Sequence, residues 1–190
     1  MKKDAMLDLE TMGVGANPAL LQIAAVAFDI NTGEIGDSFD MKIDLTDAMK
    51  YGTISASTVA FWMSDKVTPE ARNRVMQETP NWGKPGNTLC TVLTAFNEWL
   101  EKNGIMYVHG NGAASDNVWL RTAYERTGIE EGFDFRQDFC FRTLKTLAHR
   151  TGWINTVVRE GVYHDGLDDA KHQVKVLRNM LTYLGMQHIN

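Results

Sequence analysis

The 190-residue chain has few cysteines, no long hydrophobic run and no excess of positive charge. Its two cysteines, Cys90 and Cys140, lie far apart, and neither belongs to a Cys-x-x-Cys motif or a Cys/His cluster. This excludes a disulfide-dense scaffold and argues against a zinc site. Both cysteines lie among apolar or aromatic neighbours, so we expect two buried, reduced thiols.

No stretch of the sequence is long and apolar enough to span a bilayer. The longest apolar stretch, residues 19–28, contains Gln22 and falls far short of the roughly 20 residues that a membrane-spanning helix needs. Asp4 interrupts the N-terminal segment where a signal peptide would have its apolar core. We therefore expect a soluble, cytoplasmic protein that does not bind membranes.

Basic residues are outnumbered, with 19 Lys and Arg against 24 Asp and Glu and a net charge of −5. Residues 1–100 hold 13 acidic and 8 basic groups, whereas residues 101–190 hold 11 of each. This balance argues against a protein that coats duplex nucleic acid, but it allows an enzyme that holds a nucleic-acid end in a small site. The length and a hydrophobic content of 44% predict a single domain over residues 1–190.

Hydrophobic periodicity predicts a fold that opens with strands and then mixes helices and strands. Strands are predicted at residues 5–9, 20–29 and 38–45, with a turn at 31–33, and at 106–108 and 139–141. Helices are predicted at 58–62, 69–76, 89–102, 117–126 and 143–150 and after Asp169, with a loop at 81–87. This order predicts an α/β fold, a mixed β-sheet flanked by helices.

Two carboxylates share one face of the first predicted strand. Asp8 and Glu10 are two residues apart, so both side chains point the same way near the end of the strand. Such a pair is costly unless a cation lies between the two groups, and Mg²⁺ prefers oxygen ligands of this kind. The ordinary alternative is a strand that runs out into solvent at this point.

Two further acidic positions and a histidine lie at the starts of predicted helices. Asp116 follows a strand and opens a helix, and Asp169 opens the last helix, five residues after His164. Capping of the helix explains each acid locally. What favours a metal site is the conjunction of four acids and a histidine, each at the end of an element.

These residues resemble the three motifs of the DEDDh 3′–5′ exonucleases, the group of RNase T, oligoribonuclease and the proofreading subunit of polymerases. The first motif is Asp8-x-Glu10-Thr11, and the second is Asp116 at the start of a helix. The third is His164 followed, after four intervening residues, by Asp169. The wider string 7–13, with 17–19 and 111–113, is most similar to the RNase T-like and phage-type branch. The related tyrosine subclass is excluded because Asp165 stands at the position of its tyrosine. Ser115 and Gly166 depart from the family pattern beside the motifs, which affects local packing more than catalysis.

The resemblance implies a ribonuclease H-like fold and a two-metal hydrolysis of phosphodiester bonds. Asp8, Glu10, Asp116 and Asp169 would hold two Mg²⁺ ions, or Mn²⁺, and a neutral His164 would accept the proton of the attacking water. The expected substrate is a single-stranded nucleic acid with a free 3′ end, shortened to nucleoside monophosphates. DNA is favoured by the phage-type resemblance, with RNA as the alternative. Relatives of this kind are often homodimers, so pairing of two copies is compatible with the sequence.

Residues outside the motifs are assigned to the substrate with less support. The turn of Thr11, Met12 and Gly13 is expected to contact the terminal nucleotide, although Met12 fits the core equally well. Trp153, in the segment before His164, is a candidate for stacking on a base or, equally, a cover for the edge of the core. Trp62, Trp99 and Trp119 are predicted core residues. The candidates for contact with the nucleic-acid backbone are Arg121, Arg126, Arg142, Lys145, Arg150 and Arg159.

Two other classes of function compete with an exonuclease. A phosphatase or dinucleotide hydrolase could use the same residues on a small molecule in a closed pocket. A catalytically silent binding module on the same fold would be expected to have lost at least one of the five motif positions, and all five are occupied.

Overall fold

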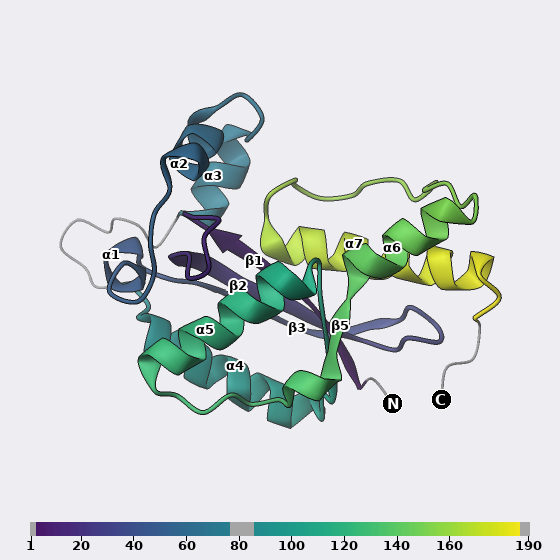
Figure 1. The fold of residues 1–190 in the computed structure, drawn as a ribbon, viewed down its shortest axis with the longest axis horizontal. Helices are drawn as coiled ribbons and strands as arrows, with labels where there is room; N and C mark the ends of the chain where they lie inside the picture. The colour runs from purple at the N-terminus through teal and green to yellow at the C-terminus, as the bar shows by residue number, and fades with distance from the viewer. Residues whose placement is uncertain (1–2, 77–85, 187–190) are drawn as a thin grey trace.

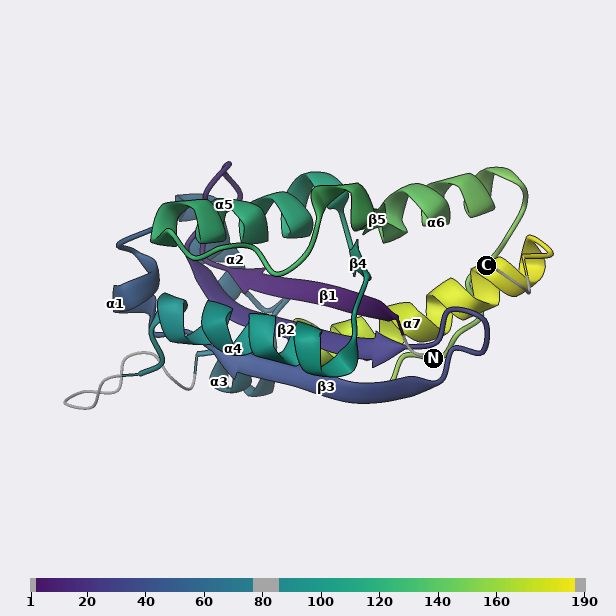
Figure 2. The ribbon, with the colours of Figure 1, turned by 90° about the horizontal axis from the view of Figure 1, so that it is seen from below.

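Five strands form one mixed sheet in the computed structural model, which describes residues 3–76 and 86–186. Figure 1 shows the sheet among its helices, and Figure 2 shows the order across it, β3-β2-β1-β4-β5. The strands are β1 (Asp4–Thr11), β2 (Leu20–Phe28), β3 (Ile35–Lys42), β4 (Tyr107–Gly110) and β5 (Asp138–Cys140). β1, β2 and β3 form an antiparallel meander, whereas β4 runs parallel to β1 and β5 parallel to β4. The predicted α/β fold with a mixed sheet is confirmed.

Helices cover both faces of this sheet. The helices are α1 (Leu45–Ala48), α2 (Ala56–Met63), α3 (Pro69–Val75), α4 (Leu89–Asn103), α5 (Val118–Thr127), α6 (Phe141–Arg150) and α7 (Gly166–Tyr183), with a π-helical turn η1 (Ala113–Asn117) and a 3₁₀ turn η2 (Phe135–Gln137). α7 packs against β1 and β2, and α4 packs against β2 and β3 from the other side (Figure 2). Gly104 and Gly128 end α4 and α5 in the left-handed conformation, as their places in the sequence predict.

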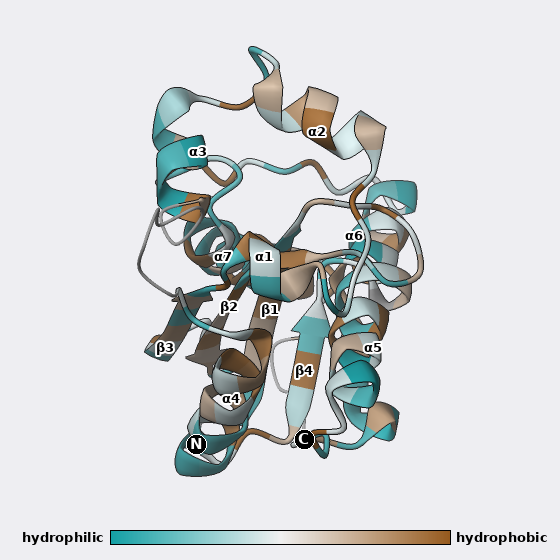
Figure 3. Cartoon of the chain, turned by 90° about the vertical axis from the view of Figure 1, so that its left-hand side faces the viewer, coloured by the Kyte–Doolittle hydropathy of each residue, from teal (hydrophilic) through white to brown (hydrophobic). Residues whose placement is uncertain are grey.

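The two faces of β1 differ in chemistry, and this difference positions the acidic residues. Ala5, Leu7 and Leu9 join the larger hydrophobic core, which includes residues of α4 and α5. Met6 joins the second core, beneath α7. Because side chains alternate along a strand, Asp8 and Glu10 lie on the Met6 face, toward α7. Figure 3 shows the hydrophobic residues along β1 and β2, between helices whose outer sides are more hydrophilic.

Two boundaries, the end of β3 and the start of α7, lie earlier in the chain than the sequence patterns predict, because an aspartate caps the helix that begins at each one. β3 ends at Lys42 because Asp44 accepts hydrogen bonds from the backbone N–H groups of Thr46 and Asp47 and thereby caps α1. α7 begins at Gly166 because Asp165 is its N-cap, so Asp169 lies in the first turn rather than before the helix. The helices predicted at 58–62 and 69–76 are present as α2 and α3. Of the loop predicted at 81–87, residues 81–85 lie outside the described residues.

The expectation of two buried thiols is wrong, since both cysteines are half-buried. Cys140 is the N-cap of α6, and its Sγ accepts hydrogen bonds from the Thr143 backbone N–H and hydroxyl at 3.4 and 3.1 Å. Cys90 lies at the start of α4 with its Sγ 3.6 Å from the Tyr51 hydroxyl. Each of the two thiols lies at the N-terminal end of a helix rather than within the core, and each is therefore partly exposed. Across residues 3–76 and 86–186, no helix has the length and apolar character needed to cross a membrane.

Candidate active site

Acidic side chains from three separate elements meet at the end of β1. Asp8 and Glu10 come from β1, Asp116 from η1 and Asp169 from the first turn of α7. One ligand atom each of Glu10, His164 and Asp169 lies within 4.8 Å of the other two. Besides burial, the charges of Asp116 and Asp169 raise the pKa of both Asp8 and Glu10, so the four acids lie near one another and, with His164, meet at one corner of the sheet.

Asp116 reaches this corner because η1 follows β4 directly. Its Oδ2 accepts hydrogen bonds from the Gly112 backbone N–H at 2.8 Å and from the Ser115 hydroxyl at 3.1 Å. Its Oδ1 accepts a longer bond, 3.4 Å, from the backbone N–H of Leu9 in β1. The pairing of β1 with β4 ends at Leu7 and Gly110, so the Asp116 carboxylate takes the place of a partner strand at the next free N–H of β1.

Two glutamines attach the start of α7 to the strands beneath it. Gln173 of α7 donates from Nε2 to Asp8 Oδ1 at 2.7 Å, and both residues are buried. Gln22 of β2, opposite Glu10 in the strand register, accepts a hydrogen bond from the Gly166 backbone N–H at 3.1 Å. These bonds fix the position of the helix that carries Asp169. Neither glutamine was singled out from the sequence, because each lies far along the chain from its partner.

Burial and mutual repulsion make the acidic cluster costly to ionise. Burial, followed by the charges of Glu10, Asp116 and Asp169, raises the pKa of Asp8 well above its ordinary value, against the opposing hydrogen bond from Gln173. Burial and neighbouring carboxylates likewise raise the pKa of Glu10 well above its ordinary range. Burial raises the pKa of Asp116 and of Asp169 also. A cation bound among these groups would remove the repulsion.

A single arginine contacts this cluster among the described residues. Arg159, in the irregular segment before α7, forms an ion pair with Oδ1 of Asp169 and donates to the Val162 carbonyl at 2.8 Å. Its guanidinium also lies 4.3 Å from the centre of the Tyr163 ring. The pairing opposes the rise in the pKa of Asp169 that burial causes. Arg159, predicted as a backbone contact for the nucleic acid, is instead bound to a candidate metal ligand.

His164 is held beside the carboxylates in an unusual backbone conformation. Its φ is +64°, and it is the one non-glycine residue with positive φ among residues 3–76 and 86–186. Its backbone N–H donates to Asp169 Oδ2 at 3.2 Å. The ring meets Phe61 of α2 edge-on, with 5.0 Å between the ring centres. Backbone strain of this kind persists where the surroundings over-determine it, and it clusters at functional sites.

Of the predicted nucleotide-binding turn, Thr11 lies beside a hollow, whereas Met12 and Gly13 pack against the rest of the protein. Thr11 lines a hollow of about 260 Å³ together with Glu10, Val14, Ser57, Thr58, Phe61 and Trp62. Met12 is buried in the larger core. Gly13 is required by close packing, because a Cβ there would lie 2.5 Å from the Thr53 carbonyl oxygen. Phe61 was missed in the sequence, where Phe61-Trp62 looks like ordinary core.

The assignment of Trp153 to base stacking is wrong. Trp153 is 2% exposed and belongs to the core beneath α7. Its Nε1 donates to Asn179 Oδ1 at 2.8 Å, and its ring packs beside that of His149. The segment after α6 folds inward here because the indole ring packs in an apolar core while its N–H has the half-buried Asn179 side chain as acceptor. Of the predicted core tryptophans, Trp62 and Trp99 are buried, and Trp119 is half-buried against the same core.

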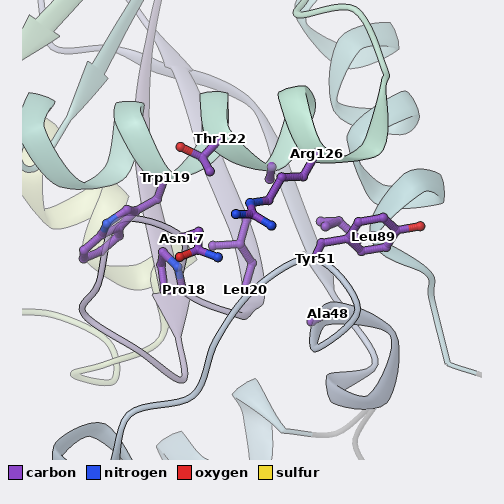
Figure 4. Close-up of a pocket in the computed structure, with 11 residues that line it drawn as sticks. Asn17, Pro18, Leu20, Ala48, Tyr51, Leu89, Trp119, Thr122 and Arg126 are labelled. Atoms are coloured by element: carbon purple, nitrogen blue, oxygen red, sulfur yellow. The ribbon is translucent and has the colours of Figure 1, made fainter.

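The candidate backbone-binding residues take different positions. Arg121 is bound to Glu131 and Asp138, and Lys145 lies 5.9 Å from the centre of the Phe141 ring. Arg126 lines a hollow of only about 10 Å³ with Asn17, Leu20 and Tyr51 (Figure 4). That volume holds at most about one water molecule, so it is no substrate site. Arg142 and Arg150 line an open hollow that begins at Gly112 and Ser115.

Comparison with known proteins places this geometry in a family. Residues 3–181 match the model of the 3′–5′ exoribonuclease Rv2179c-like domain. An exodeoxyribonuclease of enterobacteria phage T4 is 32% identical over 80 residues, which cover 38% of this chain and 34% of that protein. The chain thus spans about a third of the length of this curated relative.

Solved structures share the fold at low sequence identity. The nuclease domain of 3′hExo, a DEDDh family member bound to rAMP, superimposes with a TM-score of 0.63 at 15% identity, over 98% of this chain and 95% of that one. Pop2p of S. pombe, in a form with Mg²⁺ and Mn²⁺ bound, gives 0.61 at 12%, over 100% and 86%. E. coli ExoI in a zinc-bound complex with single-stranded DNA gives 0.62 at 14%, over 97% and 41%.

These similarities confirm the ribonuclease H-like fold and the resemblance to the DEDDh exonucleases. The five motif positions of that resemblance are the same residues that meet at the end of β1. The family match extends over nearly all of the described chain. The chain therefore belongs to the 3′–5′ exoribonuclease Rv2179c-like domain family.

Proposed function

We propose that this chain is a metal-dependent 3′–5′ exonuclease that removes nucleoside monophosphates from the 3′ end of single-stranded nucleic acid. The observation that carries the proposal is the meeting, at the end of β1, of three buried carboxylates with the half-buried Asp169 and His164, in a chain of an exonuclease family. The family match to residues 3–181 supports one exonuclease domain over residues 1–190.

The residues at this corner fit a pair of divalent cations. Asp8, Glu10, Asp116 and Asp169 offer oxygen ligands, which Mg²⁺ and Mn²⁺ prefer, and the raised pKa values of all four mark a cluster that lacks a sufficient counter-charge. When bound, such ions make water a stronger nucleophile and neutralise charge on the phosphoryl group. A relative of the same fold is described with Mg²⁺ and Mn²⁺ bound.

His164 is the candidate general base. One nitrogen of its ring lies within 4.8 Å of oxygens of Glu10 and Asp169, close to the place where a water and a phosphate would meet. A neutral imidazole there takes the proton of the attacking water. Phe61 packs against the ring and Asp169 accepts the backbone N–H, so the imidazole is held from two sides.

The hollow beside Glu10 is the candidate site of the 3′-terminal nucleotide. It has a volume of about 260 Å³ and combines the Phe61 ring with the hydroxyl groups of Thr11 and Ser57. An aromatic face packs against any base, and hydroxyl groups bond to a sugar or a phosphate. Thr11 keeps its place in the predicted binding set, with Met12 and Gly13 beneath it.

Relatives act on different sugars, and the proposal covers both. The family description names an exoribonuclease, whereas the phage relative is an exodeoxyribonuclease. A protein distinguishes RNA from DNA at the 2′-hydroxyl. The preference for one sugar would therefore be set in the hollow lined by Thr11, Ser57 and Phe61, where the terminal nucleotide is proposed to bind. Pairing of two copies of the chain stays a prediction.

Digestion of matched 5′-labelled oligonucleotides tests the proposal. Single-stranded RNA, single-stranded DNA and duplex of one sequence are incubated with Mg²⁺, with Mn²⁺ or with EDTA. We expect a ladder that shortens from the 3′ end, requires the metal and disappears in Asp8→Ala. Asp134→Asn, which neutralises an exposed carboxylate outside the cluster, is the matched control and should digest normally. Activity that persists in folded Asp8→Ala, or release of internal fragments, would contradict the proposal.

A small-molecule phosphodiesterase is the alternative, and the same assay tests it when a dinucleotide is added as a further substrate. The hollow beside Glu10 is open rather than closed over a small ligand, since it lies at the surface next to exposed Val14. Hydrolysis of a dinucleotide with no shortening of the longer strands would favour the alternative. Progressive shortening of the long strands would exclude it.

A further inference from the structure

A second hollow, of about 460 Å³, lies along α6 and includes two residues of the segment that holds Asp116. Gly112 and Ser115 form its near end, and these are the two residues that donate hydrogen bonds to Asp116 Oδ2. Arg142, Thr146 and Arg150 form its length. They are spaced four residues apart, so they share one side of α6. One end of the hollow is therefore only one hydrogen bond away from Asp116 of the candidate active site.

The charge in this hollow is opposite to that of the acidic cluster. Its lining contains Arg142 and Arg150 and no carboxylate. Both arginines are exposed, and within the described part of the chain neither has an ion pair with an acid. This sets them apart from three other arginines: Arg74 is bound to Glu70 and Asp168, Arg121 to Glu131 and Asp138, and Arg159 to Asp169.

Arg142 is also held at the mouth of the hollow. Its backbone N–H donates to the Asn111 carbonyl at 3.0 Å. The centre of its guanidinium lies 3.4 Å from the point where a Cβ of Gly112 would stand. The arginine thus packs directly against Gly112, where a Cβ would instead lie only 2.5 Å from the Ser115 hydroxyl oxygen that donates to Asp116. Arg150 lies eight residues further, about 12 Å along the helix axis.

We propose that the hollow along α6 binds the backbone phosphates of the substrate strand, upstream of the bond that is cleaved. A guanidinium recognises phosphate through two parallel hydrogen bonds, and two unpaired ones on one helix side match a chain of phosphates. The hollow has few aromatic or base-edge contacts to offer, so the binding is independent of sequence. This assignment rests on the proposed function and extends it from the terminal nucleotide to the strand behind it.

The groove makes a length-dependent prediction. Arg142→Gln and Arg150→Gln should each weaken binding of a labelled oligothymidylate of about twelve residues roughly tenfold, the loss expected of one hydrogen bond to a charged group. Each should also lower the slope of log affinity against log salt concentration by about 0.7, the value for one phosphate of a single strand. Arg136→Gln, which removes an exposed arginine paired with Asp134, should change neither quantity.

Binding is measured by fluorescence anisotropy in EDTA, and cleavage of a dinucleotide is measured separately with Mg²⁺. Supporting results are weaker binding of the long strand with unchanged hydrolysis of the dinucleotide. Unchanged affinity and salt slope in both variants would overturn the assignment, as would an equal loss on the dinucleotide. If the unaltered protein hydrolyses neither substrate, the proposed exonuclease activity fails, and the anisotropy series still decides whether this groove binds a strand.

Discussion

The two ends of β1 carry buried acids on the same side of the strand, and they treat them in opposite ways. At the start, Asp4 Oδ1 accepts a hydrogen bond from His109 Nε2 at 2.7 Å, and both side chains are buried. At the end, Asp8 and Glu10 are as deeply buried but face further carboxylates. The comparison shows that the protein provides a hydrogen-bonded histidine partner for the buried acid at one end of β1, whereas among residues 3–76 and 86–186 neither Asp8 nor Glu10 at the other end is hydrogen-bonded to a histidine or paired with a cationic side chain. That end is arranged for a ligand, at a cost to the ligand-free protein.

Neutralising Asp8 should have the largest effect, because it separates the contribution of this acid to catalysis from its contribution to stability. We expect Asp8→Asn to lower kcat about a thousandfold or more, because several kcal/mol of charge stabilisation are lost with the metal ligand. The metal-free variant should be as stable as the unaltered protein or more stable, since one repelling charge is gone and the amide oxygen still accepts from Gln173. Single-turnover digestion and thermal unfolding in EDTA measure the two effects. A folded variant that lost stability in EDTA would show that Asp8 supports the structure.

Removing His109, beside the start of β1, should have the opposite pattern of effects: it should lower stability and leave catalysis unchanged. His109→Phe leaves Asp4 buried without its partner, and we expect a loss of about 3 kcal/mol in the free energy of unfolding. The cleavage rate per folded molecule should stay the same. Urea unfolding measures the loss, and Asp4→Leu/His109→Phe is the matched control, because replacement of both partners by apolar groups removes the uncompensated charge. Equal destabilisation in the single and double variants would contradict this account of the pair.

The stabilisation that Mg²⁺ gives should depend on pH. The pKa values of Asp8, Glu10, Asp116 and Asp169 are raised on folding, so the folded chain holds protons that the unfolded chain releases. Their contribution to stability is therefore present below the ordinary carboxyl pKa and is lost as the pH rises through the raised values. A bound cation restores it. We expect Mg²⁺ to raise the Tm by several degrees at about pH 8 and by less near pH 5. The same rise at both values, or a rise in Asp8→Asn equal to that of the unaltered protein, would oppose this assignment.

The smallest expected effect concerns the arginine at the cluster. Arg159→Gln frees Asp169 from its ion pair, so a divalent cation no longer competes with the guanidinium. We expect Mn²⁺ to bind about two- to fivefold more tightly by calorimetry, and the Tm in EDTA to fall slightly. Arg74→Gln, at the exposed ion pair with Asp168, is the control. Weaker binding of Mn²⁺ would instead make Arg159 a residue that positions Asp169.

The sequence predicted the parts of the fold whose signals are local. The strand meander and the helix ends at Gly104 and Gly128 follow from spacing and from the chemistry of neighbouring residues. The roles of the five motif residues came from the family resemblance and stay a prediction, although the structure places these residues together. The predicted start of α7 is too late in the chain. Aspartates stand at positions 165, 168 and 169, and only the folded structure shows that Asp165 caps the helix. Local patterns do not distinguish three equivalent caps.

Contacts between distant segments could not be predicted from one sequence. Gln173 and Asp8 are 165 residues apart, and no spacing rule relates them. Phe61 contacts His164 from α2, in a stretch that reads as ordinary helix. Trp153 was placed by its nearness in sequence to His164, yet the segment turns inward and buries it. The division of the arginines into paired and unpaired ones depends on the same long-range packing.

The bond from Leu9 to Asp116 has a consequence for the choice of an inactive protein. Because Asp116 occupies the edge of β1 beyond its last pair with β4, a change there alters a strand edge as well as a charge. Complexes trapped for structure determination are therefore better made with Asp8→Asn or Glu10→Gln. The same bond bears on sequence change after a loss of catalysis: in an inactive descendant, Asp116 would still be needed at the edge of β1, because its carboxylate accepts the Leu9 backbone N–H.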